Sequence, residues 1–197
     1  MADQLRLILG EIQRRGGIGR GPLEPEIAHA EQFATVVGDA RVVGDAIIAG
    51  RATTVVDLGS GGGLPGLVIA VRCPGAHLAL IERRAKRADL LRYGVHALGL
   101  GDRVAVVEAD AAEVPACSEV ITGWGRADVV TARSFGPPSV VAGHAARLLA
   151  PGGRLVVSEP PGMSTRWSDT TVRELGFRIE GRRGAVQVLR FDDRRFT

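Results

Sequence analysis

Short apolar runs alternate with amphipathic stretches along the chain from about residue 51 onward. Five of these runs are rich in β-branched residues and predict strands at 54–58, 77–82, 103–108, 128–132 and 154–158. Helical spacing fills the gaps, most clearly at 86–98, where Leu90, Leu91, Val95 and Leu98 fall on one face. Strands that alternate with helices predict βαβ units and therefore a mostly parallel, doubly wound α/β sheet.

The two ends of the chain show different patterns. Residues 1–15 have a partial helical period that stops at Gly16-Gly17, and 24–50 read as helix interrupted near Gly38 and Gly44. After a last helix at 170–175, the strands 177–180 and 186–191 flank a turn-like segment, 181–184, and predict an antiparallel hairpin. We therefore expect a helical segment at 1–50 followed by one domain at 51–197.

Composition narrows the class of protein. The 197 residues are 45% apolar, which suits one folded domain, and the longest apolar run, 67–71, is far shorter than the roughly 20 residues of a membrane helix. Cys73 and Cys117 lack metal-site spacing, and no apolar leader follows Met1. These features predict a cytoplasmic protein with no metal site and no membrane partner, in which both cysteines are small buried residues.

The segment VVDLGSGGGLPG at 55–66 carries the strongest chemical signal, because an apolar strand ends in glycines that let a ligand approach the backbone. Two motifs compete for it. Gly61, Gly63 and Gly66 fit the dinucleotide pattern GxGxxG, whereas Asp57, Gly59, Gly61 and Gly63 fit the DxGxGxG pattern of S-adenosylmethionine-dependent methyltransferases. A carboxylate at Asp57 would repel a pyrophosphate but can meet the ammonium of the methionyl group. The segment therefore favours S-adenosylmethionine.

Acidic residues at the next two strand ends are candidates for the rest of this cofactor. Glu82 ends the second strand, where a carboxylate can accept hydrogen bonds from both ribose hydroxyls; the alternative is a surface charge facing Arg83 or Arg84. Asp110 follows the third strand and can bind the adenine amino group, with Glu113 and Glu108 as competitors.

Residues 55–159 resemble the small-subunit rRNA guanine-N7 methyltransferases (RsmG, also called GidB). The resemblance is carried by the segment 57–66, by the Lys86-Arg87 pair and by TARSF at 131–135. It implies a class I methyltransferase fold with a C-terminal antiparallel hairpin, S-adenosylmethionine as cofactor, and small-subunit rRNA or a ribosomal particle as partner. By resemblance, Gly59 and Leu64 line the cofactor pocket, and Ala111 and Ala112 contact adenine through the backbone. Arg133 would face cofactor and substrate, with Ser134 beside the substrate.

Several positions depart from the family pattern. Asp110 and Ala112 replace an arginine and a glutamate, Ser158-Glu159 replaces a lysine-glycine pair, and the basic tail is reduced to 192–197. Three functions stay open: an rRNA guanine-N7 methyltransferase, a small-molecule methyltransferase, and a non-catalytic cofactor-binding or RNA-binding module. A cationic rim beside the cofactor site would favour RNA, whereas a closed apolar cavity would favour a small substrate.

Catalysis at guanine N7 needs no strong base, since that nitrogen carries a free lone pair, and positioning suffices. This agrees with the scattered histidines, for which we expect structural or solvated roles. Arginine dominates the cations: 24 of the 25 basic residues are arginine, at a net charge of only +3. Candidate RNA contacts lie at 83–87, at Arg133, and at Arg182, Arg183, Arg194 and Arg195. Arg133 could instead form an ion pair with Asp110 or Glu159.

Overall fold

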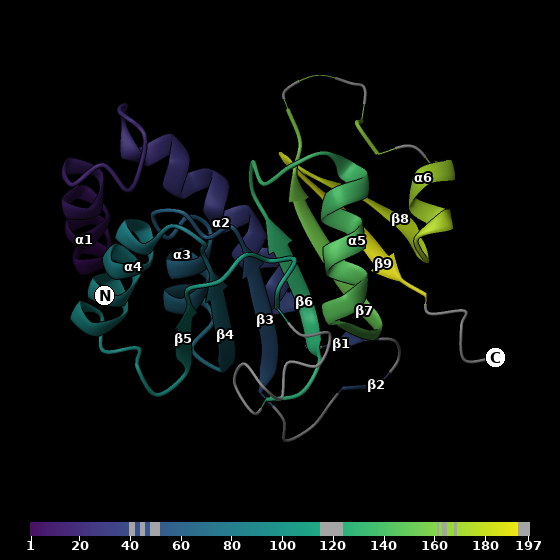
Figure 1. Ribbon diagram of the computed structural model, residues 1–197, viewed down its shortest axis with the longest axis horizontal. Helices are drawn as coiled ribbons and strands as arrows, with labels where there is room; N and C mark the ends of the chain where they lie inside the picture. The colour runs from purple at the N-terminus through teal and green to yellow at the C-terminus, as the bar shows by residue number, and fades with distance from the viewer. Residues whose placement is uncertain are drawn as a thin grey trace.

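The computed structural model describes residues 1–39, 42–43, 46–47, 52–114, 124–160, 162, 165–167 and 169–192, and its centre is a seven-stranded sheet (Figure 1). The strands are β3 Thr53–Leu58, β4 Ala76–Ile81, β5 Val104–Val107, β6 Ala127–Ala132, β7 Leu149–Ser158, β8 Phe177–Arg183 and β9 Val186–Phe191. Their order is β5-β4-β3-β6-β7-β9-β8. The first five are parallel, and β9 pairs antiparallel with both β7 and β8. This confirms the predicted parallel sheet and its closing hairpin.

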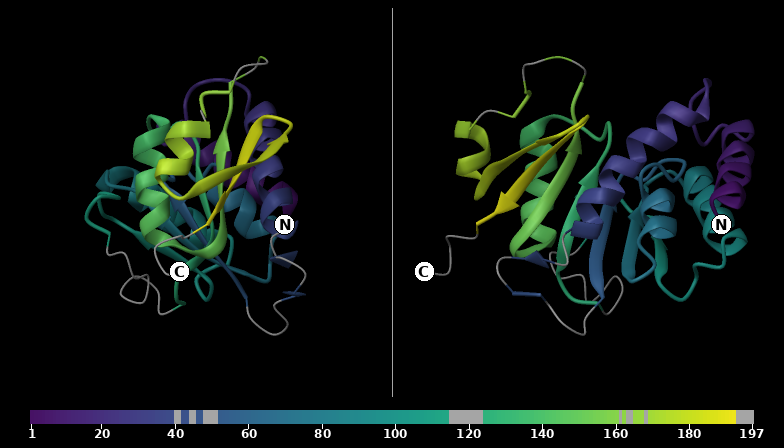
Figure 2. Two further views of the ribbon diagram at one scale, coloured as in Figure 1. Left: turned by 90° about the vertical axis from the view of Figure 1, so that its right-hand side faces the viewer. Right: turned by 180° about the vertical axis from the view of Figure 1, so that it is seen from behind.

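Helices cover both faces of the sheet, as the two views in Figure 2 show. They are α1 Ala2–Arg14, α2 Leu23–Asp39, α3 Gly66–Arg72, α4 Ala85–Ala97, α5 Pro138–Leu148 and α6 Asp169–Glu174. Alternate strand residues feed two cores: Val55 packs with residues of α1 to α4, and Val56 packs with residues of α5 and α6. Because the sheet is covered on both faces, β3 is buried along its whole length, including Thr53, Thr54 and Asp57.

Two local predictions were wrong. Helix α2 ends at Asp39, close to the interruption expected near Gly38, but the helical pattern expected beyond it is replaced by β1 (Val42–Val43), which pairs antiparallel with β2 (Ala46–Ile47). These short strands contain β-branched side chains, which favour extended backbone. The hairpin turn expected at 181–184 is also misplaced, because β8 continues through Arg183 and the chain reverses at Gly184, whose φ is +60°.

The N-terminal helices reach the carboxyl ends of the parallel strands. A Cβ atom at Gly62 would lie 2.6 Å from the carbonyl oxygen of Gly17, so the α1–α2 connection packs directly on the glycine loop. Helix α2 is also held at its far side, where the Ala185 N–H donates to Gln32 Oε1 at 2.6 Å. Within the described part of the chain, no helix combines the length and apolarity needed to cross a membrane.

Candidate functional site

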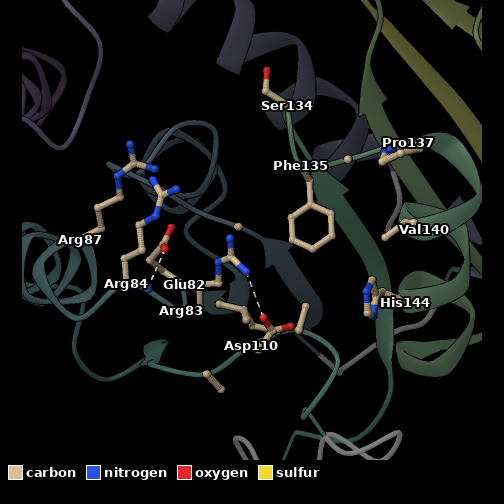
Figure 3. A pocket seen from close by; sticks show the side chains of 15 residues that line it. Glu82, Arg83, Arg84, Arg87, Asp110, Ser134, Phe135, Pro137, Val140 and His144 are labelled. Atoms are coloured by element: carbon tan, nitrogen blue, oxygen red, sulfur yellow. Dashed lines mark hydrogen bonds and ion pairs between the residues drawn. The ribbon is translucent and has the colours of Figure 1, made fainter.

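A cavity of about 350 Å³ lies at the carboxyl ends of the parallel strands, the edge where ligands bind in doubly wound sheets (Figure 3). Residues that follow four neighbouring strands line it, together with side chains of α4 and α5. These are Gly59 after β3, Ile81 to Arg84 at the end of β4, Ala109 to Ala111 after β5, Ser134 to Pro137 after β6, Arg87 of α4, and Val140 and His144 of α5. The volume falls in the range of small-molecule sites.

Asp57 lies at the end of β3, beneath the glycine loop, and is 1% exposed. Burial raises the pKa of its carboxyl to about 6, although the Thr131 hydroxyl, which donates to Oδ1 at 2.6 Å, opposes the shift. Arg133 acts on this carboxylate electrostatically but forms its ion pair with Glu26, so the buried charge of Asp57 is a poor contributor to stability. It is well suited to meet a cationic group of a ligand.

Glu82 is buried rather than a surface charge, with 5% of the residue exposed. Its Oε2 accepts a hydrogen bond from the Gly61 N–H at 3.0 Å, and its Oε1 accepts one from the Arg84 N–H at 2.9 Å. Each oxygen keeps a second lone pair for a ligand hydroxyl. Glu82 therefore ties the glycine loop to the end of β4 and lines the cavity with its carboxylate.

Asp110 is the one member of its group of three candidates that lines the cavity. Its Oδ1 accepts from the Ala112 N–H at 3.0 Å, and its Oδ2 lies 3.4 Å from Arg83 Nη1. The Ala112 N–H, and after it the Arg83 guanidinium, hold the pKa of Asp110 below its ordinary value. The competitor Glu108 is engaged by Arg92 at 2.9 Å, and Glu113 is exposed outside the cavity.

The remaining predicted cofactor residues divide into two groups. Gly59 and Ala111 line the cavity, whereas Gly61, Gly63, Leu64 and Ala112 belong to the same two loops but do not line it. A Cβ atom at Gly59 would lie 2.6 Å from Cδ2 of Phe135, so the Phe135 ring packs closely over this glycine. Gly59, Gly61 and Gly63 all have positive φ, which accounts for glycine at these positions.

Arg133 does not line the cavity. Its guanidinium pairs with the carboxylate of Glu26 on α2, in place of the Asp110 or Glu159 partner considered from the sequence, and its side chain is 18% exposed. The neighbouring Ser134 does line the cavity and has a φ of 54°, which is strained for a residue with a side chain. At the tip of β6, Arg133 therefore contacts α2, and the next residue, Ser134, lines the cavity.

Sequence reasoning missed several lining residues. Figure 3 shows the Phe135 ring between the charged residues after β4 and the apolar Pro137 and Val140. His144 meets Phe135 edge-on, with ring centroids 5.8 Å apart. Phe135 could have been suspected from the TARSF segment, but Val140 and His144 lie on a helix, where no strand-end position identifies them.

Other candidates have structural roles in the described part of the chain. Glu159 is buried, and its N–H donates to the Ala185 carbonyl at 2.9 Å, which ties β7 to the hairpin turn. Arg182 donates to the carbonyls of Pro160 and Gly162, and Arg183 pairs with Asp39. Arg194, Arg195 and Cys117 lie outside the described residues, and Cys73 is half-buried. Among described residues, no group of three or more His, Cys, Asp or Glu side chains could hold a metal ion.

The family model and the named relatives that match this chain carry the same description. A family model described as rRNA small subunit methyltransferase G (GidB) matches residues 29–160. A protein named ribosomal RNA small subunit methyltransferase G from Rubrobacter xylanophilus is 36% identical over 185 residues, covering 92% of this chain and 66% of its own. Another of that name, from Salinispora arenicola, is 46% identical over 106 residues, covering 52% and 42% respectively. The chain thus spans between about two fifths and two thirds of the length of these relatives.

Solved structures share the architecture. One described as a putative sarcosine dimethylglycine methyltransferase from Galdieria sulphuraria superimposes with a TM-score of 0.58 at 15% identity, covering 77% of this chain and 62% of that protein. At this identity the likeness concerns the fold alone. The predicted class I methyltransferase fold is confirmed.

Proposed function

Because this chain belongs to the rRNA small subunit methyltransferase G family, we propose that it transfers a methyl group from S-adenosylmethionine to N7 of a guanine in small-subunit rRNA. The observation that carries the proposal is the cavity at the strand ends, where the buried Glu82 carboxylate is bonded to the glycine loop above the buried Asp57. Carboxylates beside a glycine loop suit a ligand that has hydroxyl groups and an ammonium group, because a carboxylate can accept hydrogen bonds from both.

Different residues bind different parts of the cofactor. Glu82 accepts hydrogen bonds from the ribose hydroxyls with its free lone pairs, and Asp110 accepts one from the adenine amino group at the other end of the cavity. Asp57 attracts the methionyl ammonium through the glycine loop, where Gly59 and Gly61 leave room for close approach. The backbone at Ala111 and Ala112 borders the adenine.

The chemistry asks for position rather than for a base. The sulfonium of the bound cofactor supplies an electrophilic methyl group, and guanine N7 offers a lone pair with no proton to remove. Within the described part of the cavity, the wall formed by Phe135, Pro137 and Val140 can hold a planar base and exclude water. Ser134 at the tip of β6 lines the cavity and is positioned to border the substrate, whereas the Arg133 guanidinium is paired with Glu26 and is not part of this wall. His144, in edge contact with Phe135, is not required as a base.

The character of the cavity favours RNA over a small-molecule substrate. Arg84 and Arg87 line one side of it, which is the cationic rim expected for a polyanion and not the closed apolar cavity expected for a small molecule. Small-subunit rRNA, free or in a ribosomal particle, is the partner that agrees both with this cationic rim and with the family to which the chain belongs. Such a substrate would place the protein in the cytoplasm, the compartment inferred from the sequence.

The test is methyl transfer to small ribosomal subunits isolated from cells that lack the gene. Purified protein with radioactive S-adenosylmethionine is expected to label the RNA, and nucleoside mass spectrometry is expected to find 7-methylguanosine at a single position. Glu82→Ala should abolish the label. Cofactor binding without any labelling of the subunits would overturn the rRNA assignment, and label in a nucleoside other than 7-methylguanosine would overturn the assignment to N7.

A further inference from the structure

Most cations of this arginine-rich chain are engaged within the protein. Some form surface ion pairs, such as Arg92 with Glu108, and others donate to backbone carbonyls, as Arg147 does to Ala112 and Val114. Among the described basic side chains, only Arg20, Arg84, Lys86 and Arg87 make neither an ion pair nor a hydrogen bond. Three of these four are clustered within four consecutive positions.

Their position is unfavourable for the protein alone. Arg84 caps the N-terminus of α4, Lys86 and Arg87 lie in its first turn, and this turn contains no acidic residue. The N-terminal end of a helix carries partial positive charge, and like charges three positions apart repel each other. Cations without ion-pair partners at this position disfavour the helix, and an anionic ligand bound there would offset that cost.

The three residues also border the cavity. Arg84 and Arg87 line it, whereas Lys86 is exposed beyond it. Figure 3 shows Arg84 and Arg87 on the α4 side, with their guanidinium groups pointing the same way, across from Pro137 and Val140. Val140 is 45% exposed and offers apolar surface on that side. A cationic side facing an apolar side matches a nucleic-acid strand, which has phosphates along one edge and bases along the other.

We propose that Arg84, Lys86 and Arg87 form a phosphate-binding rim that holds the backbone of the substrate RNA strand beside the cofactor cavity. The proposal rests on the proposed function, because it takes the RNA as the substrate, and it assigns the residues that would contact it. Arg83 is outside the rim, since its guanidinium is paired with Asp110. The contacts would be with phosphates and would contribute affinity and register rather than recognition of the base sequence.

The test is the salt dependence of RNA binding. A fluorescein-labelled single-stranded RNA is titrated with protein over a series of KCl concentrations, at saturating S-adenosylhomocysteine, and anisotropy gives the Kd. Each phosphate contact contributes about 0.7 to the slope of log K against log salt for a single strand, so the R84Q/K86Q/R87Q variant should lose about 2 from the magnitude of that slope. The R84K/R87K variant keeps all three positive charges and should therefore keep the slope of the parent protein.

A matched control removes the same number of charges elsewhere. The R6Q/R72Q/R178Q variant takes away three exposed arginines of surface ion pairs on α1, α3 and β8, and its slope should stay near that of the parent protein. Equal losses in both triple variants would overturn the rim, because the effect would then follow net charge alone. An unchanged slope in the R84Q/K86Q/R87Q variant would overturn it as well.

Methyl transfer separates this proposal from the proposed function. If the parent protein labels small-subunit rRNA but the R84Q/K86Q/R87Q variant does so with unchanged KM for the subunits, the rim is wrong and the proposed function stands. If the parent protein binds the cofactor but neither binds nor labels RNA, both fail. An increase in KM for the subunits of at least several-fold, together with the smaller salt slope, supports the rim.

Discussion

Replacing Asp57 with asparagine is expected to stabilise the cofactor-free protein at neutral pH while weakening cofactor binding. The carboxyl is fully buried, and its pKa is raised from 3.8 to about 6. A raised acidic pKa means that the folded state holds the proton more tightly than the unfolded state. The stability contribution is therefore complete below pH 3.8 and is lost as the pH rises through about 6.

The size of the effect follows from the shift. Ionisation of Asp57 costs the folded state about 3 kcal/mol at pH 8 and about 1.6 kcal/mol at pH 5. Asparagine removes this cost, and its side-chain oxygen can still accept from Thr131. The difference in free energy of unfolding between Asp57→Asn and the parent protein should therefore grow by about 1.4 kcal/mol from pH 5 to pH 8.

Urea denaturation of both proteins at several pH values measures this difference. Other titrating groups are shared by the two proteins and cancel, so the comparison isolates position 57. Isothermal titration calorimetry with S-adenosylhomocysteine should show weaker binding by the variant, because it lacks the negative charge that we propose attracts the ammonium of the ligand. A difference in unfolding free energy that stays flat or shrinks as the pH rises would refute the reasoning about burial.

Three further substitutions test the site. Glu82→Gln should weaken S-adenosylhomocysteine binding by about 1–3 kcal/mol in calorimetry, since charged hydrogen bonds to hydroxyls are replaced by neutral ones; unchanged affinity would contradict the ribose role. Gly59→Ala should lower the free energy of unfolding by about 1–3 kcal/mol in urea, because φ is 66° and the added Cβ meets Phe135; parent-like stability would argue against that packing. Glu26→Ala should cost about 1–3 kcal/mol by leaving the largely buried Arg133 without its counter-charge, whereas Glu26→Asp should cost less; equal losses in a urea titration would contradict the ion pair.

The sequence determined the architecture and the position of the cofactor edge. Central strands of a sheet covered on both faces are mostly apolar, so the short apolar runs located β3 to β7 to within a few residues, β7 being extended at its start. Glycine adopts positive φ without strain, so the glycines of 55–66 located the sharp turn that follows β3, where Gly59, Gly61 and Gly63 all have positive φ. Glu82 and Asp110 could be selected because the ends of parallel strands converge at one edge, a rule that depends on chain order alone.

The tertiary structure decided which charges are available. Arg133 pairs with Glu26, 107 positions away, because α2 packs across the tip of β6, and nothing in the local sequence specifies that contact. In the sequence, Arg182 and Arg183 are as plausible RNA contacts as Arg84 and Arg87. In the structure, Arg182 donates to backbone carbonyls and Arg183 pairs with Asp39. Arg84 and Arg87 line the cavity and have no such partner among the described residues. Whether a charge is neutralised depends on neighbours brought together by folding, and composition and spacing contain no information about those neighbours.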